Sequence, residues 1–207
     1  MKEIGKLILV LTLICFIAAL ALYQVNEFTK EPIALAYKEE KLKAIRNVLP
    51  KYDNMPDTEN KGKIEIVIGV DDDGNNLTKD YYVATMGDEV VGVAFEGVSS
   101  EGYGGDIVVM IGVEPDGTIH GIEIIRHAET PGLGSKIAEE PFLSIFPGRN
   151  LENTKWGVKK DGGDIDQITG ATISPRAVVF AIDDELKRFS EKREEIIEKS
   201  KLILPPE

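Results

Sequence analysis

Residues 7–25 contain no charged side chain and are almost entirely apolar. As an α-helix, this segment would measure about 28 Å, close to the ~30 Å thickness of the hydrocarbon core of a bilayer. Lys2 and Lys6 precede it, and basic residues beside a span favour the cytoplasmic side of a membrane. We therefore predict a cytoplasmic tail at residues 1–6, a single transmembrane helix at residues 7–25, and an extracytoplasmic location for the rest of the chain.

Two other interpretations of this apolar segment compete with an anchor. A cleaved signal peptide would use Ala19-Leu20-Ala21 as its cleavage site, but the apolar run is longer than a usual signal sequence and continues past that site. A lipoprotein signal would use Cys15, but the residues before it lack the small side chain that such a signal requires. A retained anchor accounts for the whole run.

The remainder of the chain is acidic. The whole sequence has a formal charge of −12, and removing the two lysines and one glutamate of residues 1–25 leaves −13. Such a domain lacks the clustered Lys and Arg of a nucleic-acid surface, and anionic lipid heads repel it. The single cysteine, Cys15, lies within the apolar run, which excludes an intrachain disulfide and a cysteine-based metal site.

Two further helices are predicted, one on each side of a region of strands. The first begins at Pro32, since proline is favoured in the first turn of a helix, and ends at Pro50 and the polar stretch 53–61. The second begins at Ser174-Pro175. Their apolar residues recur at helical spacing: Ile33, Leu35, Leu42, Ile45 and Leu49 in the first, and Val178, Ile182, Leu186, Phe189 and Ile196 in the second.

Between these helices, short apolar runs separated by turn residues predict β-strands. They lie at 64–70, 81–86, 90–95, 107–113 and 119–125. Hairpin connections, rather than helical crossovers, favour an antiparallel sheet. The predicted fold is α+β: after the transmembrane helix come a helical connector at 26–62, an antiparallel-sheet domain flanked by helices at 63–200, and a C-terminal tail at 201–207.

Three glycine-rich loops are candidate sites, at residues 102–105, 129–136 and 166–172. None of them matches a P-loop or the dinucleotide-binding pattern G-x-G-x-x-G. His120 and His127 are predicted to face different sides of the chain and not to share a metal ion. No pairing of a nucleophile with a base is legible. We therefore predict neither a metal site nor a catalytic residue.

The third loop has features that suit a bound phosphate. The hydroxyl of Thr172 is sterically open because Gly170 and Ala171 precede it. The predicted helix starts directly afterwards, and the free amides and positive end of a helix favour a phosphate group there. A phosphate esterified on Thr172 would therefore be held by the fold itself. The alternative is that Thr172 or Ser174 only caps the helix.

At this loop the sequence resembles a known family. Asp166, Thr169, Gly170, Ala171 and Thr172 match the signature D-x-x-[ST]-G-A-T of proteins that carry FMN on the last threonine through a phosphodiester bond. In that family a separate flavin transferase attaches the FMN, with FAD as donor. Thr169 stands where serine is commoner, and Ile173 stands where a serine or threonine is frequent. Neither departure removes the acceptor hydroxyl, and the resemblance implies FMN on Thr172.

The resemblance extends over nearly the whole chain. The loop 102–105, the strand 107–112 and the segment 127–134 occur in this order, after a single N-terminal span, in the G subunit of the Rnf electron-transport complex. That protein is similar to the C subunit of the sodium-pumping NADH:quinone reductase, which is usually longer. The resemblance implies that residues 63–200 are an FMN-binding domain, and it places these residues at the flavin: Glu129, Thr130, Gly132, Leu133 and Gly134.

An Rnf complex passes electrons from reduced ferredoxin to NAD⁺ and moves Na⁺ or H⁺ across a bacterial or archaeal cell membrane. The resemblance implies that this chain is an electron relay without catalytic turnover of its own. Its partners would be multi-span membrane subunits, a second flavin subunit, iron–sulfur subunits and the flavin transferase. The alternatives are the C subunit of the sodium-pumping enzyme, a membrane-anchored flavin redox sensor, and an anchored binding domain in which the motif around Thr172 is only a helix cap.

Overall fold

The computed structural model describes residues 2–58, 61–71 and 73–201. The predicted C-terminal tail beyond residue 201, like Met1, lies outside the described residues. The chain divides into two compact units, one that ends at Glu40 and one that begins at Lys41. The first is helical throughout its described residues, and the second contains the sheet.

Helix α1 runs from Lys2 to Val48, so the predicted transmembrane helix and the predicted helix after Pro32 are one element. The expected start at Pro32 is therefore wrong. A proline inside a helix removes one backbone hydrogen bond, and the neighbouring turns are rich in helix formers such as Ala, Leu, Lys and Glu, which keep the helix continuous. The predicted tail is helical from Lys2 onward, and the same helix ends at Val48, within the predicted connector. Leu49 precedes a proline, and this position disfavours helical backbone.

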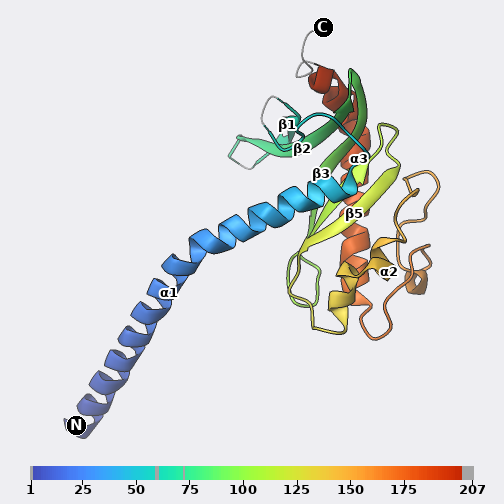
Figure 1. Ribbon diagram of the computed structural model, residues 1–207. Helices are drawn as coiled ribbons and strands as arrows, with labels where there is room; N and C mark the ends of the chain where they lie inside the picture. Colours follow the sequence, from blue (N-terminus) through green and yellow to red (C-terminus); the bar gives the residue numbers. More distant parts are fainter. Residues whose placement is uncertain (1, 59–60, 72, 202–207) are drawn as a thin grey trace. The chain divides into compact units, whose positions relative to one another are not determined.

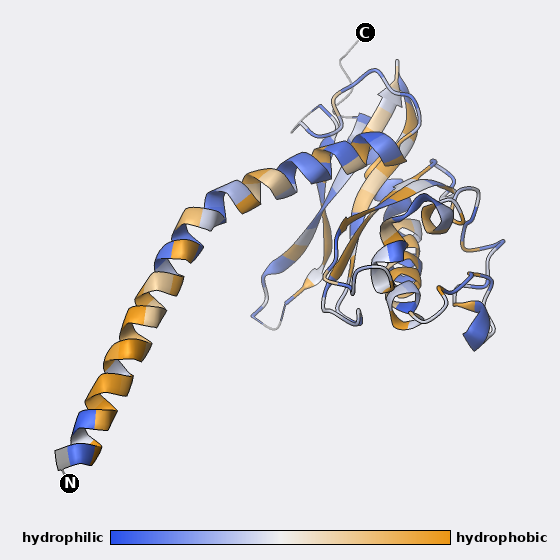
Figure 2. Ribbon diagram, turned by 60° about the horizontal axis from the view of Figure 1, so that its bottom comes forward, coloured by the Kyte–Doolittle hydropathy of each residue, from blue (hydrophilic) through white to orange (hydrophobic). Residues whose placement is uncertain are grey.

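The first half of α1 meets the requirements of a membrane span. Among the described residues, α1 is the one helix that is long and apolar enough to cross a membrane, and none of its most apolar stretch is buried. Figure 2 shows this stretch as mostly orange, after a polar start. The exposed Leu, Ile and Phe side chains of this stretch form a continuous apolar surface, which is far larger than the apolar patches of soluble proteins. The length and composition support a single-pass membrane protein.

The second unit is built on a five-stranded antiparallel sheet in which each strand pairs with the next one in sequence, which confirms the α+β fold. The strands are β1 (Lys63–Val70), β2 (Asn76–Met86), β3 (Glu89–Ser99), β4 (Ile107–Val113) and β5 (Ile119–Arg126). β2 starts earlier than predicted because residues 76–80 pair with β1, and β3 ends later because residues 96–99 pair with β4. Polar residues join a strand where a neighbouring strand supplies hydrogen bonds, and a hydrophobic pattern does not mark them.

Both faces of the sheet are covered by helix. Helix α3 (Ile173–Lys201) lies along one face (Figure 1), where the rings of Phe95 and Phe189 stack with centroids 5.5 Å apart. All five apolar positions that the sequence predicted for α3 are buried. On the other face, Ala44, Ile45 and Val48 at the end of α1 are buried together with Leu49, and Val48 lies against Gly112 of the sheet. The core therefore lies on both sides of β2–β5.

The segment between β5 and α3 is mostly irregular. It contains the short elements η1 (Gly134–Ala138), α2 (Glu140–Leu143) and η2 (Lys159–Asp161). Phe142 and Phe146 are buried there with their rings edge to face, and Trp156 packs against the core. Because these side chains fix the segment to the sheet, the two glycine-rich loops at its ends have defined positions.

Candidate functional site

The three glycine-rich loops meet at one end of the sheet. Strands β3 and β5 both run antiparallel to β4, so both finish at the same end of the sheet. The loops that follow them therefore lie close together. The start of α3 reaches the same place. The three segments enclose a pocket of about 410 Å³ that is lined by Tyr103, Glu129, Thr130, Leu133, Gly134, Gly170, Ala171, Thr172, Ile173 and Ser174.

Thr172 lies at the start of α3, on the wall of the pocket. Its side chain is half-buried, and its carbonyl accepts a hydrogen bond from the amide of Arg176 at 3.3 Å, which begins the helix. Its hydroxyl makes no hydrogen bond within the described part of the chain. The first amides of a helix have no carbonyl partner in the helix itself and attract anions. Thr172 therefore offers a hydroxyl next to a place that favours a phosphate.

The loop after β5 forms the opposite wall. Leu133 is 46% exposed, and its side chain lies beside Gly170, which has a positive φ of 80°. Gly134 faces the inner part of the pocket, where an added Cβ would lie 2.5 Å from the side-chain oxygens of Glu129 and Ser174. A larger residue at Gly134 would collide with both. This wall therefore combines an apolar surface with a close approach of backbone.

Glu129 connects the loops. It is 5% exposed, its Oε1 accepts a hydrogen bond from the Gly104 amide at 3.0 Å, and its Oε2 accepts one from the hydroxyl of Ser174. Gly104 lies so close to the chain before Glu129 that an added Cβ would be 1.9 Å from the Ala128 carbonyl oxygen. One buried carboxylate therefore joins the loop after β3, the loop after β5 and the start of α3.

Seven of the ten residues that the sequence placed at the site line this pocket, and three lie outside it: Asp166, Thr169 and Gly132. Asp166 is exposed and pairs with Lys159 at 2.7 Å. Thr169 and Gly132 are exposed as well. Asp166 therefore joins the loop 166–172 to η2 through this ion pair and does not line the pocket.

Three further residues line the pocket although no motif predicted them there: Tyr103, Ile173 and Ser174. Tyr103 lies between the glycines of the loop 102–105, and those glycines were the signal that could have drawn attention to it. Ser174 was considered only as a cap, but its hydroxyl donates to Glu129, far away in the sequence. Spacing along the chain does not reveal such a contact.

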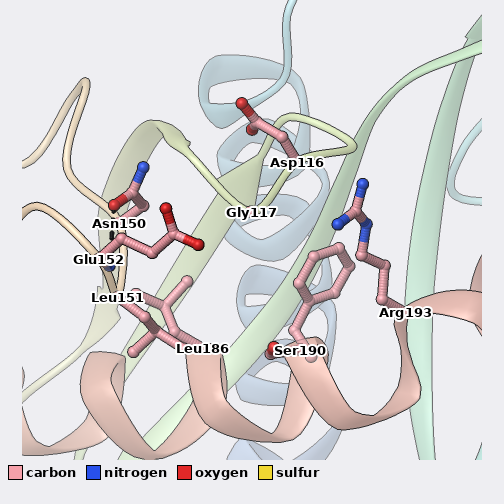
Figure 3. Close-up of a pocket in the computed structure, with 9 residues that line it drawn as sticks. Asp116, Gly117, Asn150, Leu151, Glu152, Leu186, Ser190 and Arg193 are labelled. Atoms are coloured by element: carbon pink, nitrogen blue, oxygen red, sulfur yellow. Dashed lines mark hydrogen bonds between the residues drawn. The ribbon is translucent and has the colours of Figure 1, made fainter.

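Two other features of the described residues lie away from this pocket. His120 is near Glu114, whereas His127 Nδ1 accepts the Glu129 amide, so the two histidines have separate surroundings. A second hollow, of about 290 Å³, lies between the turn after β4 and the later part of α3, where Asp116, Glu152 and Arg193 surround it (Figure 3). Leu186 in its floor is about 20 Å along α3 from Thr172. None of the predicted site residues lines this hollow.

An ion pair next to the pocket changes the pKa of a carboxyl group, and this change can be measured. Arg176, in the first turn of α3, donates two hydrogen bonds to Asp161, at 2.5 and 2.6 Å. They favour the ionised carboxylate and lower the pKa of Asp161. The pair therefore adds stability above the ordinary carboxyl pKa, and this stability is lost as pH falls through the lowered value.

We expect an NMR titration of the Asp161 carboxyl carbon to give a pKa below the usual range in the wild-type chain and an ordinary value in Arg176→Gln. Because the pair is exposed, the variant should lose little stability at neutral pH. An unchanged Asp161 pKa in Arg176→Gln would contradict the pairing.

Comparison with known proteins places this geometry in a family. Residues 102–187, which include all the pocket residues, match the FMN-binding domain family. The chain is also similar to proteins named as the G subunit of the ion-translocating oxidoreductase complex. The one from Cereibacter sphaeroides is 38% identical over 196 residues, which are 91% of this chain and 85% of that relative. The one from Shewanella baltica is 34% identical over 199 residues, which are 93% and 91% of the two chains.

A solved structure, that of NqrC from Shewanella oneidensis, covers 65% of this chain and 69% of its own at 22% identity, with a TM-score of 0.49. This likeness is too distant to support an assignment to a family. The G-subunit relatives show the family, because each of them is similar to this chain over most of its length. This chain belongs to the G-subunit family of the ion-translocating oxidoreductase complex.

Proposed function

We propose that this chain is the electron-relay subunit of an ion-translocating ferredoxin:NAD⁺ oxidoreductase and that it carries FMN through a phosphodiester bond to Thr172. One observation carries the proposal: the half-buried Thr172 lies where the start of α3 meets a pocket, directly opposite the loop 129–134. The names of the relatives, which are subunits of ion-translocating oxidoreductase complexes, support the assignment to such a complex.

The residues present fit an FMN. Its isoalloxazine needs an apolar wall with close backbone approach, which Leu133 and Gly134 provide, and Tyr103 and Ile173 add further apolar surface. Its phosphate needs hydrogen-bond donors and a favourable potential, which the first turn of α3 provides next to Thr172. The pocket volume of about 410 Å³ is within the range of about 300 to 1,000 Å³ that is common for ligand sites.

The flavin supplies the redox chemistry when it is bound, because it accepts and releases electrons one at a time. The work of the chain is to hold it. Thr172 would hold one end through its ester oxygen, the loop 129–134 would orient the ring, and the core beneath α3 would keep both walls in place. Apart from the ester formed on Thr172 during maturation, the proposal requires no pocket residue to react, which agrees with a relay that lacks turnover of its own.

The proposal includes partners and a location. We infer contacts with multi-span membrane subunits, a second flavin subunit and iron–sulfur subunits, and a complex that moves Na⁺ or H⁺. A flavin transferase must reach Thr172 during maturation, and the neighbouring loop residues Gln167, Thr169 and Gly170 are exposed. We place the FMN domain outside the cytoplasm, on the basis of Lys2 and Lys6 before the span.

Mass spectrometry tests the proposal. When the full-length chain is co-expressed with a flavin transferase, we expect its mass to increase by that of FMN minus one water, and peptide mapping should place the addition on Thr172. The chain expressed without the transferase is the control and should have its unmodified mass. An unmodified Thr172 in the co-expressed protein would contradict the proposal.

A further inference from the structure

Glu129 is the single charged residue among those that line the pocket. It is 5% exposed, and neither a lysine nor an arginine lines the pocket beside it. Another buried glutamate of this domain, Glu185, has a different environment, since it forms an ion pair with Lys79. Burying a carboxylate is costly unless it is paired or well hydrogen-bonded, so a structural reason must keep Glu129 at this position.

That reason is its hydrogen bonds. Both carboxylate oxygens act as acceptors, one from the Gly104 amide and one from the hydroxyl of Ser174. An ionised carboxylate satisfies both donors at once. The bonds hold the loop after β3 against the start of α3, and Gly134 leaves the space that the carboxylate occupies. Glu129 is therefore built into the pocket and is not a mobile surface acid.

We propose that Glu129 is a positioning residue for the two walls of the pocket and that its uncompensated negative charge lowers the reduction potential of the flavin. The inference rests on the proposed FMN site. Reduction adds an electron to the flavin, and a nearby negative charge in a poorly screened pocket opposes that addition. The start of α3 carries the equivalent of only about half a positive charge, which is less than the full charge of the carboxylate.

The test compares Glu129→Gln with the wild-type chain, each full-length in detergent and loaded with FMN. Glutamine keeps both contacts, because its oxygen accepts the Gly104 amide and its amide donates to Ser174, while the charge is removed. We expect a spectroelectrochemical titration to give a higher midpoint potential, with the reduced flavin favoured at least tenfold, or about 59 mV for one electron.

A charge-matched control separates this local effect from a change in net charge. Glu139 is exposed at the end of η1 and does not line the pocket. Glu139→Gln should leave the midpoint potential unchanged. An unchanged potential in Glu129→Gln, or an equal shift in both variants, would overturn the proposed role of the charge.

A second measurement tests positioning without any flavin. In the unloaded wild-type chain, amide hydrogen exchange should be slower at Gly104, which donates to Glu129, than at Gly105, whose amide makes no hydrogen bond within the described residues. Glu129→Gln should keep this protection, and Glu129→Ala should lose it. Equal exchange at both glycines of the wild-type chain would refute positioning. A chain that lacks FMN on Thr172 would instead count against the proposed function, and the exchange result would still stand.

Discussion

We expect Thr172→Val to abolish the covalent attachment of FMN and to leave the fold intact. Valine has nearly the shape of threonine but lacks the hydroxyl that would carry the ester. The Thr172 hydroxyl makes no hydrogen bond with any described residue, so its loss should cost less than the ~1 kcal/mol of a lost helix cap. Intact mass after co-expression with a flavin transferase measures attachment, and thermal unfolding measures stability.

Thr169→Val is the matched variant, because Thr169 is the other threonine of the same motif and is exposed outside the pocket. We expect it to retain FMN on Thr172. If Thr172→Val kept the flavin mass and Thr169→Val lost it, the acceptor would be Thr169. If Thr172→Val were instead destabilised by a full capping energy and the wild-type chain carried no flavin, the interpretation of the motif as a helix cap would hold.

Much of the fold could be predicted because it depends on local periodicity. The five predicted apolar positions of α3, from Val178 to Ile196, recur at helical spacing and are all buried. The hairpins follow from turn residues between apolar runs, and neighbouring strands in sequence are neighbours in the sheet. The predicted bounds of the elements were wrong where tertiary contacts or the continuity of a helix override the local sequence pattern. Residues 76–80, four of which are polar, belong to β2 because β1 pairs with them, and Pro32 does not interrupt α1.

The candidate site could be predicted only in part, for a related reason. Motifs identified Thr172 and the loop 129–134, which do line one pocket. The contacts that assemble the pocket join residues far apart in the sequence, such as Glu129 with Ser174, and no spacing rule connects them. Asp166 shows the reverse, since it belongs to the motif but pairs with Lys159 outside the pocket. A motif therefore identifies the segments of a site more reliably than the direction of each side chain.

The second large effect that we expect is a loss of stability when the contact between the end of α1 and the sheet is disturbed. Val48, the last residue of α1, lies against Gly112 of β4, where an added Cβ would be 2.0 Å from the Val48 carbonyl oxygen and 2.6 Å from its carbon. These are backbone atoms, so a side-chain rotation cannot relieve the collision. Gly112→Ala should therefore displace the end of α1 from the sheet. We expect a loss of about 1–3 kcal/mol in the free energy of unfolding, as for other overpacked cores.

Gly121→Ala is a close control, because Gly121 pairs directly with Gly112 across β4 and β5. An added Cβ there would lie 3.4 Å from the Val48 Cα, an ordinary contact, so this variant should lose clearly less stability. Urea unfolding of the full-length chain in detergent gives both free energies, and proteolysis between residues 49 and 62 should accelerate only in Gly112→Ala. Equal effects of the two variants would mean that alanine weakens the strands themselves. A selective effect would mean that the close approach of Val48 to Gly112 holds the last turn of α1 on the sheet.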